Sequence, residues 1–462
     1  MQKRGPRLVW ISLAVVVVLV ASGYVGVSVW IHNYLRSPQF LSLVSAKTSD
    51  AFRAQATYAP LSWQGSTVYS DSLVATGNPG AIVKEIRADQ VRADVNWRAM
   101  WDGAWRLEQV DVLNFDGTFH PGSPEGGRDP ANVHPPVHGM AAWLPRRFEL
   151  GELKIAQAHV GFLTPEGIDI VDMKNSSLLV KPEGIGWTVD GAGGVLNVPH
   201  IPELAITNFR TRMQGGAFFL SDAALRLGET GKIKASGEFA GDSKVVLDWS
   251  QVDVGEFLTP AWKTRVSGNL AGTGTIQWPA NGGLPMAKAD GSFRVTDGML
   301  QNFPLLDQIA SFTQAPQFKH MPLQELSGKY QWAAGKLALS NLVLESKGLL
   351  RIEGECFIAA DGALQGTLQV GVTPQTLQWL PGSRERVFTV NRNSYVWTEV
   401  HLSGSTSNIQ EDLTSRLKSA AKDEVIDQGT KLLDQLPIPG AAKDGAKEGA
   451  KGVLDILTPL IP

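Results

Sequence analysis

One pattern runs through most of the chain: short runs of alternating apolar and polar residues, separated by turn residues. It is clearest in "LVLESKGLLRIEGECFIAADGALQGTLQVGV", residues 342–372. Within its first half, one parity is apolar and the other carries Arg351, Glu353 and Glu355. A period of two is that of a β-strand with one apolar and one solvated face. The apolar set of this stretch comprises Leu342, Leu344, Leu350, Ile352, Cys356, Ile358, Leu364, Leu368, Val370 and Val372.

The same character extends over residues 57–404, where Gly, Asn, Asp or Pro interrupts the runs every ~8–12 residues. Only three short helical stretches are expected within this region, at 97–103, 253–262 and 303–314. A region of this length holds about 30 strands at ~10–12 residues for each strand and turn, more than one sandwich or small barrel contains. The sequence therefore predicts a mainly β fold, elongated if the strands stack edge to edge.

Helices are expected on both sides of the β region. Residues 37–56 form a predicted amphipathic helix next to the membrane, with Ser37 as N-cap and Pro38 at its first position. Residues 405–436 form a second one, followed by a flexible tail at 437–462 with a short apolar end. The predicted apolar stripe of the 405–436 helix has intervals of four residues: Ile409, Leu413, Leu417, Ala421 and Val425.

The N-terminus predicts a membrane anchor. Residues 1–7 contain Lys3, Arg4 and Arg7, and the run 8–31 is uncharged. A helix over this run is long enough for a hydrocarbon core of ~30 Å, with Trp10 and Trp30 as interfacial anchors. The positive-inside rule leaves residues 1–7 in the cytoplasm and carries the rest of the chain across the membrane. A cleaved signal peptide is the alternative, because "VASG" at 20–23 offers small residues after an apolar core.

Composition narrows the functional classes. With 42 basic and 45 acidic residues, a net charge of −3 and no dense basic tract, the chain gives no electrostatic reason to expect nucleic acid. The single cysteine cannot form an intrachain disulfide. The 14 tryptophans are the one excess. They are explained by core packing or, in part, by an acyl-chain site or a membrane boundary.

The residues indicate no catalytic, cofactor or metal site. His134 and His138 have a metal-ligand spacing, but Pro135 and Pro136 lie between them and favour a solvated loop. Cys356 has no spaced partner and lies on an apolar parity, which favours a small buried hydrophobe over a nucleophile. No phosphate-binding loop and no GxSxG motif is present. We therefore expect a protein that is not an enzyme.

Several stretches resemble the AsmA-like (AsmA/TamB-type) family of bacterial envelope proteins. The longest is "GSFRVTDGMLQNFPLLDQIASFTQAPQFKHMPLQELSGKYQWAAGKLALSNLVLESKGLLRIEGECFIAADGALQGTLQVGV", residues 291–372, which is similar to the C-terminal region of that family, here about 291–404. "LSGSTSNIQEDLTSRL" at 402–417 is similar to its closing strand and helix. "YAPLSWQGSTVYSDSLVATG" at 58–77, after the anchor, is similar to its opening module.

This resemblance implies a single-pass protein of the bacterial inner membrane with most of its chain in the periplasm. It also implies a curved, groove-like sheet with an apolar inner face that binds or handles phospholipid in outer-membrane biogenesis or homeostasis. The body is shorter than that of the family members that bridge the envelope. The alternative is an envelope assembly scaffold whose sheets close on a core and whose C-terminal helix binds a protein partner.

Overall fold

The fold is described by a computed structural model. It covers residues 33–79, 81–102, 104–120, 147–164, 169–199, 201–214, 217–279, 286–302, 316–379 and 382–435, with Val29, Gly167 and Ala310. The protein is mainly β, with 23 strands in a mixed sheet and few helices, which confirms the predicted class. The chain divides into two compact units, residues 1–223 (unit 1) and 224–462 (unit 2).

Unit 1 contains one long helix and ten strands among the described residues. The elements are α2 (Pro38–Phe52), β1 (Ala54–Tyr58), β2 (Ser62–Gln64), β3 (Thr67–Gly77), β4 (Val83–Asn96), η1 (Trp97–Asp102), β5 (Ala104–Phe119), β6 (Arg147–Leu163), β7 (Asp169–Glu183), β8 (Gly186–Ala192), β9 (Val195–Asn197) and β10 (Leu204–Gln214). Strands β1 and β2 both pair with β3, and the ladder continues antiparallel to β4 and β5. β5 and β6 are parallel, and β6 to β10 are antiparallel again. Strand β11 (Ala217–Leu227) crosses the boundary between the units.

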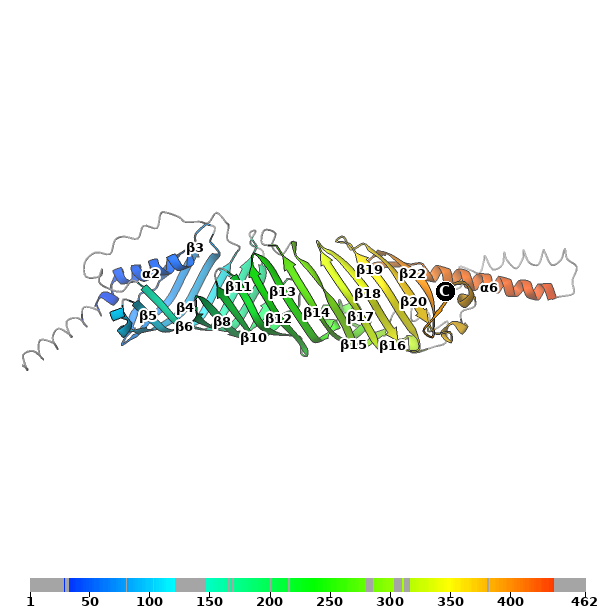
Figure 1. The fold of residues 1–462 in the computed structure, drawn as a ribbon, viewed down its shortest axis with the longest axis horizontal. Helices are drawn as coiled ribbons and strands as arrows, with labels where there is room; N and C mark the ends of the chain where they lie inside the picture. The colour runs from blue at the N-terminus through cyan, green and yellow to red at the C-terminus, as the bar shows by residue number, and fades with distance from the viewer. Residues whose placement is uncertain are drawn as a thin grey trace, which may run out of the picture. The chain divides into compact units, whose positions relative to one another are not determined.

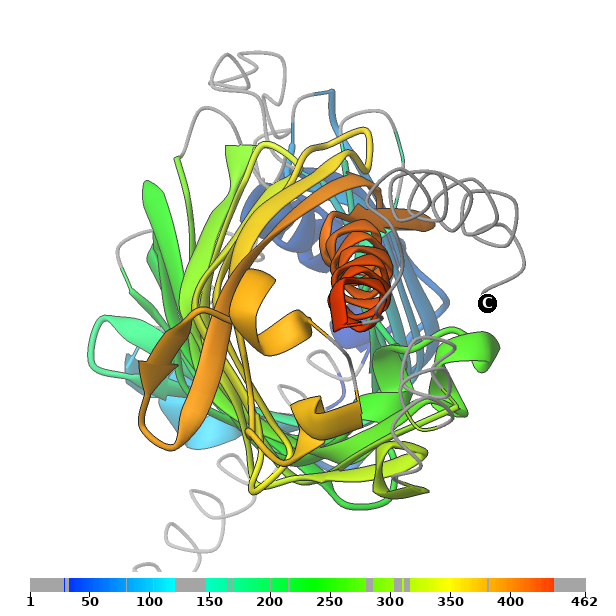
Figure 2. The ribbon, with the colours of Figure 1, turned by 90° about the vertical axis from the view of Figure 1, so that its right-hand side faces the viewer.

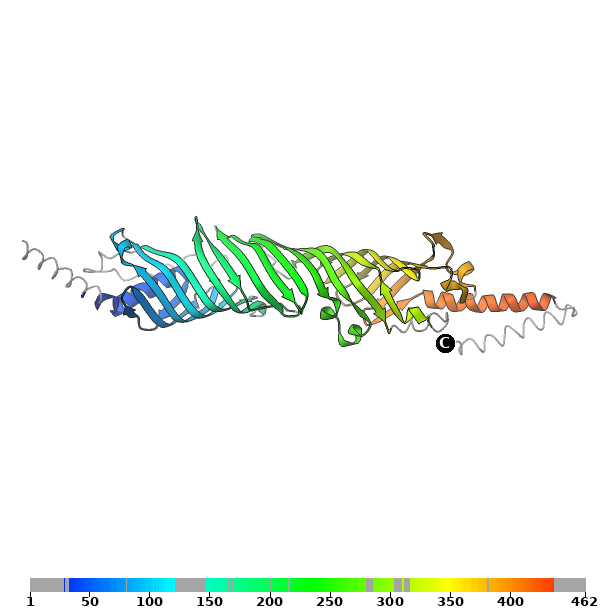
Figure 3. The same cartoon turned by 90° about the horizontal axis from the view of Figure 1, so that it is seen from below.

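Unit 2 is an antiparallel ladder in chain order, whose strands β12 to β15 lie side by side in Figure 3. The elements are β12 (Gly231–Ala240), β13 (Asp242–Asp253), η3 (Val254–Phe257), α3 (Pro260–Lys263), β14 (Val266–Trp278), β15 (Lys288–Gln301), η5 (Pro316–Phe318), β16 (His320–Leu323), β17 (Glu325–Ala333), β18 (Lys336–Ser346), β19 (Leu350–Ile358), β20 (Leu364–Val372), η6 (Thr376–Trp379), α5 (Ser383–Arg386), β21 (Val390–Arg392), β22 (Tyr395–Ser405), β23 (Asn408–Glu411) and α6 (Leu413–Gln435). β22 is the last long strand, and the short β21 and β23 pair with its two ends.

Among the described residues, strands are fewer and longer than the sequence predicts. β5 has 16 residues and β6 has 17, well beyond the length assumed for one strand and its turn. A long strand can continue through a local irregularity of its backbone. In β4, for example, Gln90 adopts a φ of 55° between two paired segments. The alternation of the sequence locates the strands correctly, but bulges of this kind hide how far each strand runs.

Helix α2 begins as predicted and ends early. The Ser37 hydroxyl accepts a hydrogen bond from the Phe40 amide, and Pro38 occupies the first turn. The predicted end at residue 56 is wrong, because Arg53 adopts a left-handed conformation (φ 50°) and Ala54–Tyr58 pairs with β3. Figure 1 shows α2, in blue, beside the strands of unit 1.

Helix α6 also differs from the predicted range of 405–436. The residues before Leu413 form the hairpin of β22 and β23, and Ile409 lies on β23 with 49% of its surface exposed. On α6, the half-buried Leu413 and Leu417 of the predicted stripe pack against the apolar cluster, which also contains the buried Ala420, whereas Val425 is 46% exposed. The reason is geometric, since a turn of 3.6 residues makes a strict interval of four drift off one face.

Five predicted segments lie outside the described residues. They are the basic N-terminus with Lys3, Arg4 and Arg7, the span 8–31 with Trp10 and Trp30 (only Val29 is described), the loop with His134 and His138, nearly all of the 303–314 helix, and the 437–462 tail. Among the helices that the structure describes, none combines the length and the apolar character needed to cross a bilayer.

Candidate functional site

The sheet of unit 2 has one apolar and one polar face. In β12, Lys232, Lys234, Ser236 and Glu238 are exposed, whereas the residues that alternate with them are buried or half-buried. β13 continues the alternation, with Lys244, Val246 and Asp248 exposed. This is the pattern of a sheet that is wet on one side only. Further along, the polar face carries an ion-pair network around Arg351, which contacts Glu345 at 2.8 Å and Glu353 at 2.7 Å.

The strand register shows that the apolar side chains form continuous rows. Directly paired residues on neighbouring strands point to the same side of a sheet. One row comprises Ala235, Leu247, Gly274, Gly291, Tyr330, Leu339, Cys356, Gly366 and Leu402. A second comprises Gly237, Val245, Ile276, Ala289, Trp332, Leu337, Ile358 and Leu364. A third comprises Val252, Leu270, Val295, Leu326, Leu344, Ile352, Val370 and Thr398.

All ten residues predicted from the sequence lie on this apolar face. Leu342 faces Gly354, which faces Leu368, and Leu350 faces Val372, so the remaining members join the same rows. The stretch 342–372 is thus one part of a surface that begins at β12. The sequence pattern identified the surface at its clearest point and missed its extent, because the alternation is less regular elsewhere.

At the C-terminal end of unit 2, helices cover the apolar face. Leu350, Val370 and Val372 are each less than 10% exposed, in one cluster with Ala420 of α6 and Leu377 of η6. Leu344, Ile352 and Leu368 pack against the same cluster, together with Leu413 and Leu417 of α6. Figure 2 shows α6 and the gold helices η6 and α5 against one side of these strands. Six of the ten predicted residues therefore belong to a core that the chain covers itself.

The apolar face over β12 to β15 has no such cover among the described residues. None of the three buried apolar clusters that the structure describes includes a residue of β12, β13 or β14. On this face Ala235, Val252 and Val295 are less than 10% exposed, whereas most of the large apolar side chains remain partly exposed. We call this surface the central face, and define it as Ile233, Phe239, Val245, Leu247, Trp249, Ile276, Trp278 and Phe293.

Glycines shape the central face. A Cβ atom on Gly272 would lie 2.8 Å from the Trp249 ring, and one on Gly274 would lie 2.3 Å from the Tyr330 hydroxyl. The Trp249 and Tyr330 rings, 6.4 Å apart, thus lie over backbone that carries no side chain. Burial raises the pKa of Tyr330. The missing side chains at these glycines leave room for the two rings on this part of the face.

Cys356 lies within the apolar rows, as predicted. It is a free thiol of intermediate burial, and burial raises its pKa. A raised pKa disfavours the reactive thiolate. The side chain acts here as a small apolar group opposite Leu339 and Gly366.

Unit 1 has its own apolar core and an aromatic cluster that the sequence did not predict. Its sheet buries Ile86, Val112 and Ile155 with several alanines. Next to α2, the aromatic residues Tyr34, Phe40, Trp63, Trp97 and Trp105 form a chain of ring contacts of 5.4–6.1 Å. Trp63 also donates a hydrogen bond to the Leu35 carbonyl at 3.0 Å. The tryptophan excess could have signalled such a cluster, but the sequence does not indicate which of these distant residues are in contact.

The main polar constellation of unit 1 is built around His159 on β6. Its Nδ1 lies 3.1 Å from an Asp116 oxygen on β5, and its Nε2 lies 2.6 Å from an Asp172 oxygen on β7. Burial would raise the pKa of Asp172, but hydrogen bonds from Lys174 and His159 outweigh it and lower the pKa. An open cavity of about 410 Å³ adjoins His159 and Asp116. Within the described part of the chain, no group of three or more His, Cys, Asp or Glu side chains is arranged so that it could hold a metal ion.

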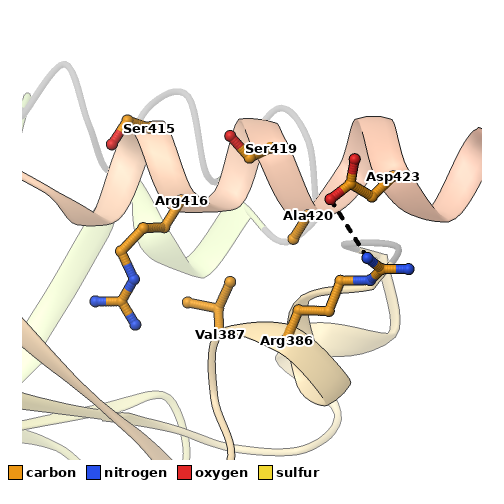
Figure 4. Close-up of a pocket in the computed structure, with 7 residues that line it drawn as sticks. All are labelled: Arg386, Val387, Ser415, Arg416, Ser419, Ala420 and Asp423. Atoms are coloured by element: carbon orange, nitrogen blue, oxygen red, sulfur yellow. Dashed lines mark hydrogen bonds and ion pairs between the residues drawn. The ribbon is translucent and has the colours of Figure 1, made fainter.

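A second small cavity, of about 260 Å³, lies between α5 and α6. Figure 4 shows Ser415, Ser419 and Asp423 on α6, with Val387 and Arg386 facing the helix. Arg386 pairs with Asp423 across it at 3.3 Å. Its lining is polar, and its ion pair is exposed.

The amphipathic sheet of unit 2, with its uncovered central face, is thus the main candidate for a functional surface. Comparisons of the chain with protein-family models, with curated proteins and with solved structures find no match.

Proposed function

We propose that this chain is a single-pass protein of the bacterial inner membrane, of the AsmA-like type, whose periplasmic sheet binds the acyl chains of phospholipid. In this proposal the protein is not an enzyme, and it handles lipid for the assembly or maintenance of the outer membrane. The observation that carries the proposal is the central face, where eight large apolar side chains share one side of β12 to β15 outside any buried cluster.

Surface physics supports a hydrocarbon ligand. Monomeric proteins rarely leave contiguous apolar patches beyond a few hundred Å² uncovered, and larger ones mark binding sites. Each CH₂ group that leaves water for such a face contributes roughly 0.8 kcal/mol, so an acyl chain gains several kcal/mol without any polar partner. The rows offer few polar partners, since Tyr330 is the one polar side chain in the row that contains Leu247. An elongated, curved groove formed by these rows is part of the proposal.

A scaffold with a closed core is the second candidate, and one observation favours it. At its C-terminal end the apolar face is already closed by α6, η6 and the segment after α5. If further protein covers the central face as well, the sheet is a core rather than a binding surface. The two candidates differ in what contacts Leu247 in the membrane-bound protein.

Site-specific photocrosslinking tests the proposal. The full chain is expressed in bacteria with a photoreactive amino acid at Leu247 or, as a matched control, at Val246. These neighbours lie on opposite faces of β13, and Val246 is 42% exposed on the polar face. We expect phospholipid adducts, measured by mass spectrometry after irradiation, at Leu247 and not at Val246.

Charge substitution gives the second arm. Leu247→Glu should abolish co-purifying phospholipid, whereas Val246→Glu, with the same change in charge on the other face, should leave it unchanged. If Leu247 forms adducts with protein only, or if no lipid co-purifies with the wild-type chain, the acyl-chain proposal is wrong and the scaffold takes its place.

A further inference from the structure

The apolar rows do not stop at the central face but run beneath α6. The row through Val295 continues over Leu326 and Leu344 to Ile352 and Val370 without a polar side chain. We call the part of the apolar rows that is covered near α6 the end face, and define it as Leu350, Ile352, Leu368, Val370, Val372, Val396 and Val400. The same apolar surface is therefore partly exposed at the central face, packed against the cluster of Phe318 and Met321 at Leu326 and Leu344, and covered by helices over β19 to β22.

The cover that α6 provides is narrow. Among the α6 residues whose side chains the structure describes, Leu413, Leu417 and Ala420 take part in the apolar cluster, and all three lie in the first eight residues of a 23-residue helix. Beyond them, Val425 is 46% exposed. The described apolar contact with the cluster thus lies at the N-terminal end of α6, and the ion pairs of Asp423 and Asp427 follow it along the helix.

Those polar interactions lie at the surface. Arg386 of α5 pairs with Asp423 and Asp427, and the side chains of these pairs are 35–55% exposed. The cavity of about 260 Å³ separates α5 from α6 beside this clamp (Figure 4). Exposed ion pairs are weak and are screened by salt. A clamp of this kind can open without disrupting a core.

The first turn of α6 is held more firmly and provides a pivot. Arg416 donates hydrogen bonds to the Glu399 carbonyl and to the Thr398 hydroxyl, and Asp412 accepts one from the His401 amide at 2.9 Å. These bonds satisfy the unpaired edge of β22 between β21 and β23. Because they involve the very start of the helix, they can persist while the segment from Leu417 onward lifts.

We propose that the end face is a second acyl-chain subsite, which α6 occupies in this structure and vacates when a lipid chain enters. This inference rests on the proposed function. The aliphatic side chain of Leu417 and the methyl group of Ala420 take the place of hydrocarbon on the same rows. A ligand chain on the central face would reach them along a row without polar side chains, past Leu326 and Leu344, which pack against the cluster that holds Phe318 and Met321.

The test uses the full chain in its membrane and reads two positions at once. A photoreactive amino acid at Leu247 reports the central face, and one at Leu368 reports the end face. Arg386→Glu breaks the clamp, Arg386→Lys keeps its charge, and Leu417→Asp weakens the apolar contact. Helix release is measured separately by labelling of Ala420→Cys in a Cys356→Ser background.

We expect Arg386→Glu and Leu417→Asp to increase labelling at Ala420→Cys. Both should also raise the ratio of lipid adducts at Leu368 to lipid adducts at Leu247 by about fivefold. A change of this size in the equilibrium follows from the loss of one weak contact. Arg386→Lys should behave as the wild type. Salt should act like Arg386→Glu, but less strongly.

Two results overturn the inference while leaving the proposed function intact: released α6 without lipid adducts at Leu368, or no release of α6 in either variant although Leu247 still binds lipid. The first shows that the end face is structural, and the second shows that α6 is a fixed part of the core. Absence of adducts at Leu247 in the wild type instead rejects the proposed function itself.

Discussion

Gly274 shows how single residues set the character of the apolar face. Its backbone lies under Tyr330 and Trp249, and a Cβ atom there would approach the Tyr330 hydroxyl to 2.3 Å and the Trp249 ring to 3.1 Å. Read as sequence, "GNLAGTGTI" offers only turn or strand glycines. In the structure, the missing side chains of these glycines make room for the Trp249 ring of β13 and the Tyr330 ring of β17.

Gly274→Ala should lower the stability of unit 2 by about 1–3 kcal/mol, the usual cost of overpacking a filled site. Tyr330→Phe in the same chain should recover part of the loss, because it removes the atom nearest to the new methyl group. Thermal unfolding followed by tryptophan fluorescence measures both effects. Gly161→Ala is the control, since a Cβ there meets nothing within 4 Å. Equal losses for Gly161→Ala and Gly274→Ala would show that ring contact is not the cause.

Among the elements, the parallel pair of β5 and β6 is held in unit 1 by side chains as well as by backbone. His159 on β6 contacts Asp116 on β5 and Asp172 on β7, so one imidazole bridges three strands. Asp172 is also paired with Lys174 at 2.8 Å. Sequence alternation places these residues on a wet face, but only the register brings them together.

This bridge predicts a pH dependence. The pKa of Asp172 is lowered in the folded protein, so its ionised form contributes stability above its unfolded value of about 3.9, and that contribution is lost as pH falls through the folded pKa. Asp172→Asn should therefore lower the unfolding temperature of unit 1 at pH 7, by an amount equivalent to about 1 kcal/mol. The difference from wild type should shrink towards pH 3.

The matched control is Asp248→Asn, which removes an exposed carboxylate that has no ion pair among the described residues. It should leave the unfolding temperature unchanged at both pH values. A loss at pH 7 that persists undiminished at pH 3 would mean that Asp172 acts through packing rather than through its charge.

Element boundaries show where sequence reasoning ends. The start of α2 was predictable, because Ser37 and Pro38 act on their own backbone within one turn. The end of α2 was not predictable, because Ala54–Tyr58 forms a strand with β3, a partner that lies further along the chain. The start of α6 was missed for the same reason, since Asn408–Glu411 pairs with β22.

At the scale of the whole molecule, each unit combines an apolar sheet face with one long helix that covers part of it. In unit 1, Phe40 of α2 is 4% exposed among Trp63 and Trp105. In unit 2, Ala420 of α6 is 3% exposed against β20 and β22. Within unit 2, α6 packs against β20 and β22 and not against the central face. The molecule therefore retains an apolar surface that its described helices do not bury, which is why a membrane-derived ligand is the proposal.

The predicted anchor supplies the test at this scale. Deletion of residues 1–32, which keeps Tyr34 and Leu35 for the aromatic cluster, should release the chain from membranes into the carbonate-soluble fraction. The full chain should remain in the pellet, since an uncharged helical run of this length exceeds the ~30 Å hydrocarbon core. A mature N-terminus just after "VASG" at 20–23 would instead show that the segment is a cleaved signal peptide.

The sequence by itself determined the mainly β class, the apolar parity of residues 342–372 and the N-cap of α2, because each depends on residues within a few positions of one another. Tertiary structure decided which strands meet, how the rows of β12 to β22 align and which part of them α6 covers. These depend on register and on packing between distant segments. A period of two fixes which side chains share a face, and only the fold fixes what lies against that face.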